Sequence, residues 1–172
     1  ALLAQLESGV PDAVISDIRM PGIDGLKLLS RISDQFPTKV RLSPVKTIRY
    51  KARDGLEIAA VLTLPAGRDP SKLPLILMPH GGPFARDAEE WDWWVQFLAW
   101  RGYAVLQPNY RGSAGYGTAF AEKGEGQWGL AMQDDLNDAV DWAVQQGIAD
   151  PARVCMVGAS YGGYAAMRAA ER

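Results

Sequence analysis

The turn around Ser160 constrains the fold of this 172-residue chain more than any other stretch. Val154 to Val157 is a short apolar run that favours a strand buried on both faces, and the alanine-rich residues 165–170 favour a helix. Between them lies Gly158-Ala159-Ser160-Tyr161-Gly162, a G-x-S-x-G pattern. Glycines at its ends let the backbone pass close to itself at a sharp corner. The context predicts a nucleophile elbow that presents the Ser160 hydroxyl, rather than a plain turn.

Composition excludes several classes of function. Apolar residues make up 48% of the chain and the net charge is −2, so nothing indicates a nucleic acid or an anionic membrane as partner. The longest apolar runs are shorter than a membrane span, and the first residues lack the pattern of a signal peptide. We therefore expect a cytoplasmic protein. Cys155 is the single cysteine and is expected in the core, and we expect no metal and no cofactor.

Residues 1–38 are predicted to form a helix-strand-helix unit. Ala13 to Ser16 is the predicted strand, and Pro21 to Gly25 is the predicted loop before the second helix. The run from Pro11 to Leu29 resembles the middle of an NtrC-like response-regulator receiver domain. The resemblance implies that Asp17 stands at the phosphoacceptor position. The Mg²⁺-binding acidic pair, the Ser/Thr and the Lys of a receiver have no counterpart here, so we expect Asp17 to be non-functional.

From residue 45 onward, strands and helices alternate after an antiparallel hairpin. Asp54-Gly55 is predicted as the hairpin turn, and the pattern favours an α/β fold with a mostly parallel sheet and helices on both faces. The predicted strands are Thr47–Ala52, Leu56–Leu64, Leu75–Met78, Tyr103–Gln107 and Val154–Val157, and the main predicted helices span residues 89–100 and about 130–146.

Two groups of side chains invite a binding interpretation but have simpler ones. The tryptophans and Phe97 of residues 93–100 are expected to form the buried face of a helix rather than a ligand box. The acidic residues of the later helix are expected to form a solvated face rather than a metal site. These acidic residues are Asp134, Asp135, Asp138 and Asp141.

Several motifs in order make residues from about 45 to 172 resemble the catalytic α/β-hydrolase domain of the prolyl oligopeptidase family, closest to its acylaminoacyl-peptidase-like members. The resemblance implies that Ser160 is the nucleophile and that the Tyr161 amide is an oxyanion donor. It also implies that His80, Gly81 and Gly82 form the neighbouring wall of the oxyanion hole, and that any substrate is a peptide or an acyl ester. The motifs are Arg53-Asp54-Gly55, His80-Gly81-Gly82-Pro83, Gln107 to Gly112, Gly115-Tyr116-Gly117, Trp128-Gly129, Asp134-Asp135 and Gly158 to Tyr164.

The same resemblance leaves the catalytic triad incomplete. In the family the acid and the histidine follow the serine, whereas this sequence ends at Arg172, twelve residues after Ser160. The β-propeller of the family is not represented. His80 is the only histidine and precedes the nucleophile, so we expect it to act in the oxyanion loop rather than as the general base. Without a base the Ser160 hydroxyl is a weak nucleophile at neutral pH.

The two resemblances predict a chimera, artificial or recombined, of a receiver fragment (residues 1–38), a junction (39–45) and the N-terminal half of a hydrolase domain (46–172), folded as one composite domain. Truncation would leave the strand at Val154 with an open edge, which is an aggregation hazard. We hypothesise that Ala13 to Ser16 pairs beside Val154 to Val157 and closes this edge. A homodimer through the same edge is the competing solution.

Three functions follow from these expectations. The favoured one is a folded and essentially inactive relic of a serine peptidase. The second is a weak esterase or peptidase that uses Ser160 with an improvised or partner-supplied base. The third is a phosphorelay or interaction module built on the receiver-like segment.

Overall fold

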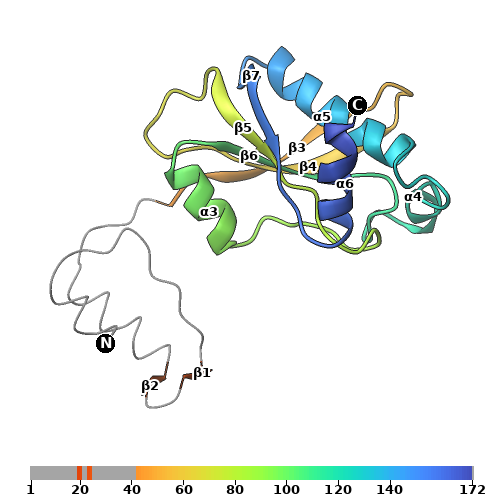
Figure 1. Cartoon of the computed structure of the whole chain (residues 1–172), viewed down its shortest axis with the longest axis horizontal. Helices are drawn as coiled ribbons and strands as arrows, with labels where there is room; N and C mark the ends of the chain where they lie inside the picture. Colours follow the sequence, from red (N-terminus) through yellow and green to blue (C-terminus); the bar gives the residue numbers. More distant parts are fainter. Residues whose placement is uncertain (1–18, 21–22, 25–41, 172) are drawn as a thin grey trace, which may run out of the picture. The chain divides into compact units, whose positions relative to one another are not determined.

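The computed structural model describes residues 19–20, 23–24 and 42–171 (Figure 1). The chain divides into two compact units, Ala1–Val40 and Arg41–Arg172. In the first unit, β1 (Arg19–Met20) pairs antiparallel with β2 (Ile23–Asp24). The segment predicted as a loop from Pro21 to Gly25 thus contains a short strand, because main-chain pairing across a tight turn is available to both sides.

The other predictions for residues 1–38 fall outside the described residues. They include the two helices, the strand at Ala13 to Ser16, its pairing beside β7 and the phosphoacceptor position Asp17. The receiver-like interpretation therefore stays a prediction.

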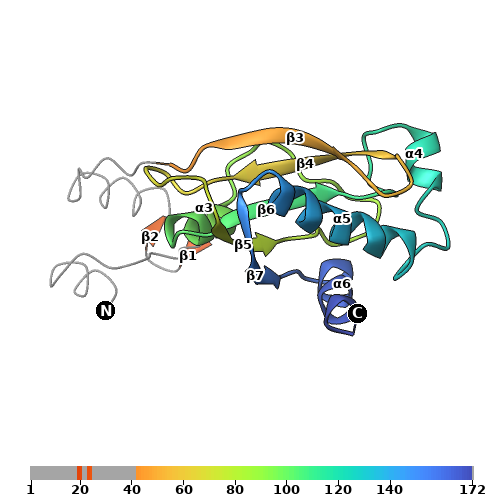
Figure 2. The same cartoon turned by 90° about the horizontal axis from the view of Figure 1, so that it is seen from above.

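The second unit is built on a five-stranded sheet with the order β3-β4-β6-β5-β7. The pairs β3-β4 and β4-β6 are antiparallel, whereas β6-β5 and β5-β7 are parallel. The predicted α/β fold is confirmed, and in the part described the sheet is mixed rather than mostly parallel. Figure 2 shows β3 and β7 at opposite edges. The strands are β3 (Val45–Lys51), β4 (Glu57–Thr63), β5 (Leu73–Leu77), β6 (Ala104–Asn109) and β7 (Ala149–Met156).

The predicted hairpin is present, with its turn at Asp54-Gly55. Residues 45–51 of β3 pair in continuous register with residues 63–57 of β4. Ala52 N donates to Leu56 O at 2.8 Å and Gly55 N donates to Ala52 O at 2.8 Å. Gly55 has φ +86°, a left-handed conformation that glycine adopts without steric cost. The local sequence therefore sets the register of the sheet edge.

Helices cover both faces of the sheet, as predicted. Ile76 and Val105 contact α3 on one face, where Val95 is buried. On the other face Leu75 and Leu106 join one core with residues of α5 and α6. Alternation along β5 and β6 thus assigns each helix to its face. The helices are α3 (Trp93–Trp100), α4 (Thr118–Glu122), α5 (Ala131–Gln145) and α6 (Tyr161–Ala170).

Helix α3 begins later than predicted and turns a different side inward. Asp92 caps it by accepting from Trp94 N at 2.8 Å and Val95 N at 3.1 Å, so residues 89–92 are not helical. The residues buried by α3 are Val95 and Ala99. Trp93 and Trp100 are 54% and 55% exposed. The prediction that all four aromatic residues form a core face is therefore wrong for these two.

Strand β7 is exposed along the segment that the sequence predicts to be buried. Val154 is 37% exposed and Cys155 is exposed. Within the described residues β7 pairs only with β5, so its other edge and part of its faces have no neighbour there. The prediction of Cys155 as a core residue is wrong for this reason.

Candidate active site

The sharp corner predicted at Ser160 joins β7 to α6. Ser160 has φ 55° and ψ −121°, a strained combination for a residue with a side chain, and α6 begins at the next residue. A Cβ on Gly158 would lie 2.5 Å from the carbonyl carbon of Gly162, and a Cβ on Gly162 would overlap the carbonyl oxygen of Pro79. Both glycines are therefore required sterically. The corner leaves the Ser160 side chain exposed.

The loop that follows β5 lies directly against this corner. Val157 N donates to Leu77 O at 2.9 Å, which holds the ends of β7 and β5 side by side. A Cβ on Gly81 would lie 3.0 Å from Ala159 O and 3.3 Å from Ser160 Cβ. Gly81 therefore packs against the elbow with no room for a larger residue unless a neighbour moves.

The first turn of α6 begins directly after Ser160. Tyr161 is the first residue of α6, and the first-turn N–H groups of a helix have no intrahelical acceptor. They also carry the positive end of the helix dipole. The structure thus brings together Ser160, the Tyr161 main chain and Gly81, three of the positions singled out in the sequence.

The imidazole of His80 is engaged on both ring nitrogens. Its Nε2 lies 2.9 Å from Ser113 Oγ, and its Nδ1 lies 3.1 Å from both Gly81 O and the Tyr110 hydroxyl. The ring stacks on Tyr110 with centroids 4.4 Å apart. Burial lowers the pKa of His80, so the neutral form is favoured at neutral pH. Because both ring nitrogens have partners, neither is free to accept a proton from the Ser160 hydroxyl in this arrangement.

Ser113 and Tyr110 were not singled out from the sequence. Both are buried at the end of β6 or just after it, in the segment that faces the His80 loop. The signal available was their place in the Gln107-to-Gly112 motif and directly after it. Nothing in their spacing indicates that they contact His80, because 30 and 33 residues of chain separate the partners.

An aromatic cluster surrounds the base of the elbow. The Tyr161 ring lies 5.3 Å from the Tyr110 ring, 5.4 Å from the Trp128 ring and 5.7 Å from the Tyr164 ring, centroid to centroid. Tyr161 is buried, and burial raises the pKa of its hydroxyl to about 12. Its side chain anchors the first turn of α6, while its main chain faces Ser160.

The acidic residues of α5 serve a buried charge network instead of a solvated face. Asp135 is buried and accepts from Arg111 Nε at 2.8 Å and from Arg111 NH2 at 2.7 Å. Asp138 is buried as well and accepts from Arg53 NH2 at 2.7 Å. The prediction was wrong for these two residues because their partners lie far away in the sequence. Asp141 is exposed, as predicted.

This network fastens the hairpin turn to α5. Arg111 NH1 also lies 2.9 Å from Asp54 Oδ2, and the Tyr50 hydroxyl donates to Asp135 O at 2.8 Å. Arg53 NH1 lies 3.5 Å from Asp134 Oδ1. The Arg53-Asp54-Gly55 and Asp134-Asp135 motifs are therefore partners in one structural network.

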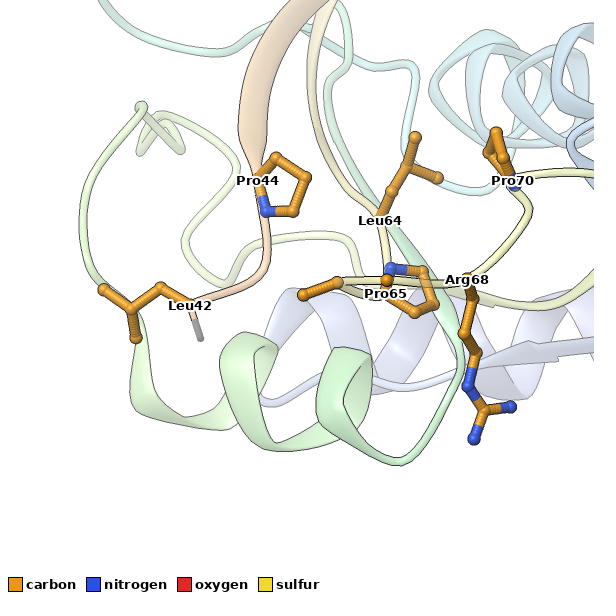
Figure 3. A pocket seen from close by; sticks show the side chains of 8 residues that line it. Leu42, Pro44, Leu64, Pro65, Arg68 and Pro70 are labelled. Carbon is orange, nitrogen blue, oxygen red and sulfur yellow. The ribbon is translucent and has the colours of Figure 1, made fainter. Parts of the chain in front are cut away.

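Two hollows lie away from the elbow. One of about 350 Å³ is lined by Leu42, Pro44, residues 64–68 and Pro70 (Figure 3), and none of its lining residues belongs to the elbow or the His80 loop. The other, of about 590 Å³, lies among β7, α5 and α6 and includes Val154, Cys155 and Ala166. Neither offers the Ser160 hydroxyl a substrate cavity within the described residues.

The described part of the chain shows neither a metal-binding cluster nor a membrane-spanning helix. Residues 19–20, 23–24 and 42–171 hold no group of three or more His, Cys, Asp or Glu side chains that could bind a metal ion. Among the helices of these residues, none combines the length and apolar character needed to cross a bilayer.

Residues 89–172 match the profile described as the prolyl oligopeptidase family. Dipeptidyl aminopeptidase BIII of Pseudoxanthomonas mexicana is 44% identical over 133 residues, which cover 73% of this chain and 19% of that protein. Among solved structures, a puromycin-hydrolysing peptidase of Mycobacterium tuberculosis superposes with a TM-score of 0.69 at 32% identity, over 74% of this chain and 20% of that one. Uncomplexed Pyrococcus horikoshii acylaminoacyl peptidase gives 0.70 at 28% identity, over 80% and 22%.

These similarities support the fold and show how much of each relative the chain covers. The structural neighbours are α/β-hydrolase peptidases, and the likeness supports the α/β fold read from the sequence. The chain spans about a fifth of the length of the curated relatives it matches.

Proposed function

We propose that residues 42–171 are part of the catalytic domain of a serine peptidase of the prolyl oligopeptidase family, and that they supply its nucleophile and oxyanion hole. Ser160 Oγ attacks the carbonyl carbon of a peptide or acyl ester. The Tyr161 N–H and the main-chain N–H groups of the Gly81–Gly82 segment stabilise the negative charge that develops on the carbonyl oxygen.

The close approach of Gly81 to the elbow carries this proposal. A Cβ added to Gly81 would lie 3.3 Å from Ser160 Cβ, so the Gly81 main chain lies close to the serine, and this closeness supports a role for the loop as a second oxyanion donor. The strained φ of Ser160 supports the same interpretation, because strain of this kind is found where a nucleophile must be presented.

We further propose that His80 is not the general base. Its Nε2 is taken by Ser113 and its Nδ1 faces Gly81 O and the Tyr110 hydroxyl. As His80 is the only histidine in these 172 residues, this polypeptide by itself leaves Ser160 without an imidazole base. We therefore expect it to be folded and essentially inactive unless a base is supplied.

Free imidazole offers a direct test. The chain is incubated with an activated acyl ester, with and without imidazole, and acylated serines are located by peptide mass mapping. In the expected step the Ser160 Oγ–acyl bond forms, the activated alcohol leaves and the hydroxyl proton passes to imidazole. Ser160→Ala is the negative control, and exposed Ser71 is an internal control for uncatalysed acylation.

We expect imidazole-dependent acylation of Ser160 at a rate well above that of Ser71. Equal rates at the two serines would contradict the assignment of the nucleophile. Rapid Ser160 labelling by a fluorophosphonate probe without imidazole would instead contradict the missing base, and would favour the weak-esterase alternative with an improvised base.

The receiver-like segment is proposed to contribute no phosphotransfer. Within residues 1–38, Asp17 has no counterpart of the acidic pair that binds Mg²⁺ and neutralises a phosphoryl group in such sites. Incubation with acetyl phosphate and Mg²⁺ is expected to leave the mass of the chain unchanged. A phosphoryl adduct that Asp17→Asn abolishes would overturn this expectation.

A further inference from the structure

The side chain of Tyr110 adjoins both parts of the molecule that carry the proposed oxyanion donors. Tyr110 is 0% exposed and directly follows β6. Its ring stacks on the His80 ring with centroids 4.4 Å apart, and its centroid lies 5.3 Å from that of the Tyr161 ring. One buried aromatic ring therefore packs against the residue before Gly81 and against the first residue of α6.

The Tyr110 hydroxyl donates a hydrogen bond to the main chain of His80. Its oxygen lies 2.8 Å from His80 O, and a carbonyl oxygen can only accept, so the hydrogen in this contact comes from the tyrosine. The distance from the same hydroxyl to His80 Nδ1 is longer, at 3.1 Å. Two oxygens at 2.8 Å repel each other unless a hydrogen lies between them, so this assignment holds whichever imidazole nitrogen is protonated.

This hydrogen bond fixes the peptide that links His80 to Gly81. The peptide is trans, and the atoms of a trans peptide lie in one plane with its C=O and N–H in opposite directions. A hydroxyl that holds His80 O therefore also directs the Gly81 N–H, to the side away from Tyr110. Gly81 packs against the elbow, where an added Cβ would lie 3.3 Å from Ser160 Cβ. The proposed donor segment thus begins with a peptide whose orientation depends on a buried hydroxyl.

A hydroxyl can fix a peptide only if its own residue is held in place, and both neighbours of Tyr110 are. Arg111 N donates to Asp135 Oδ2 at 2.9 Å, and the Arg111 guanidinium binds the same carboxylate. Asn109 is 1% exposed, and its side-chain amide accepts from Asp87 N at 2.7 Å and donates to Asp87 O at 2.9 Å. Tyr110 is therefore tied to α5 on one side and to the loop that follows β5 on the other.

We propose that Tyr110 is a positioning residue: its hydroxyl holds the His80 carbonyl and so fixes the orientation of the Gly81–Gly82 donor segment beside the nucleophile. The role of this contact in acylation rests on the proposed function. The hydrogen bond and its effect on the Gly81 peptide do not, so they can be measured in a chain that turns nothing over.

The His80–Gly81 peptide can be observed by itself, because His80 is the only histidine. Histidine labelled with ¹³C at its carbonyl carbon gives one carbonyl signal, and ¹⁵N-glycine gives one amide signal coupled to it, that of Gly81. The test variant is Tyr110→Phe, which keeps the ring and removes the hydroxyl. Tyr50→Phe is the matched control, because Tyr50 is also buried and its hydroxyl also donates to a main-chain carbonyl, Asp135 O, at 2.8 Å.

Tyr110→Phe is expected to move the His80 carbonyl signal to lower ¹³C frequency, because the carbonyl loses a hydrogen bond, and to move the Gly81 amide signal. In the imidazole-dependent acylation of Ser160, this variant is expected to lower the limiting rate about tenfold, less than the loss of a whole oxyanion donor. The ester concentration that gives half of the limiting rate should change little. Tyr50→Phe is expected to leave both signals and the rate unchanged.

Unchanged His80 and Gly81 signals in folded Tyr110→Phe would overturn the proposal. An unchanged acylation rate in that variant, or an equal fall in Tyr50→Phe, would overturn it as well. If Tyr110→Phe does not fold, incorporation of 3-fluorotyrosine decides: its hydroxyl is a stronger donor and should move the His80 carbonyl signal to higher frequency, whereas an unmoved signal would contradict the hydrogen bond. Failure of Ser160 acylation in the wild-type chain, with the expected signals present, would count against the proposed function alone.

Discussion

The two edges of the five-stranded sheet differ in composition and in what lies against them. At the β3 edge most residues are exposed or half-buried and only Tyr50 is buried, and the hairpin turn is fastened to α5 through Arg111 and Asp135. At the β7 edge, Val154 and Cys155 are exposed beside an apolar hollow of about 590 Å³. The first edge has the composition of a natural sheet border, whereas the second has that of an interior strand.

This difference shows what an apolar run in a sequence indicates. The residues of β7 are suited to burial on both faces, but burial also requires a neighbour, and within the described residues only β5 pairs with β7. The burial of a charged side chain can be mispredicted in the opposite direction: Asp135 was expected at a solvated face and is buried. The following predictions test both halves of the comparison.

Removal of the Arg111 guanidinium, which links the hairpin turn to α5, is expected to have the largest effect on stability. Arg111→Ala leaves the Asp135 carboxylate buried without its partner, which should lower the free energy of unfolding by about 3–5 kcal/mol. Arg49→Ala is the control, because its ion pair with Glu57 is exposed and should cost less than about 1 kcal/mol. Urea denaturation measures the free energy of unfolding of both variants. Similar losses of stability in the two would contradict the expected difference between the buried and the exposed ion pair.

The stability cost of truncating a side chain to alanine should be larger in the central strand β6 than in the edge strand β7. Leu106→Ala in β6 removes a fully buried side chain and is expected to cost about 2–5 kcal/mol. Val154→Ala in β7 is expected to cost less than about 1 kcal/mol, because that side chain is 37% exposed. A loss at Val154 as large as that at Leu106 would show that β7 is covered in solution.

Half-buried Asp87 should make the stability of the fold depend on pH. Burial, together with nearby Asp92 and Glu90, raises the pKa of Asp87 to about 6, and its Oδ2 has no hydrogen-bond partner among the described atoms. Between about pH 4 and pH 6 the folded state keeps a proton that the unfolded state has lost, so ionisation destabilises the fold as pH rises. Asp87→Asn should therefore be more stable than wild type by about 2 kcal/mol at pH 7 and by little at pH 4.

Denaturation curves at the two pH values test this prediction. A stability difference that is the same at pH 4 and pH 7 would contradict it. A smaller stability of Asp87→Asn at pH 7 would contradict it too.

The smallest effect is expected from a probe of Cys155. Its exposed thiol should react with a disulfide reagent at the rate of a free thiol, without prior unfolding. Absorbance kinetics at several protein concentrations measure this. A rate that falls as concentration rises would support the homodimer proposed for the β7 edge, whereas protection at every concentration would contradict an open edge.

The sequence predicted what local geometry determines. The elbow could be predicted because the glycines that permit it stand two residues from Ser160. The hairpin turn could be predicted because Asp54-Gly55 is a local signal. The α3 start was misplaced by four residues, because the predicted helix was extended back to Glu89 whereas the Asp92 side chain caps the helix.

Contacts between distant segments were not predictable in this way. The Arg111–Asp135 pair spans 24 residues and the Arg53–Asp138 pair spans 85, so each acid was interpreted without its partner. The hydroxyl contacts of His80 are of the same kind. For residues that act through partners, only the folded arrangement assigns a role.

The substitution Gly81→Ala tests whether the Gly81 loop and Ser160 form one site. The added Cβ, 3.0 Å from Ala159 O, should push the loop from the elbow and lower imidazole-dependent acylation of Ser160 about 10²-fold, the cost of one lost oxyanion donor. Gly55→Ala is the control, because it strains a distant turn at φ +86° and should leave acylation unchanged. Undiminished acylation in folded Gly81→Ala would contradict the account.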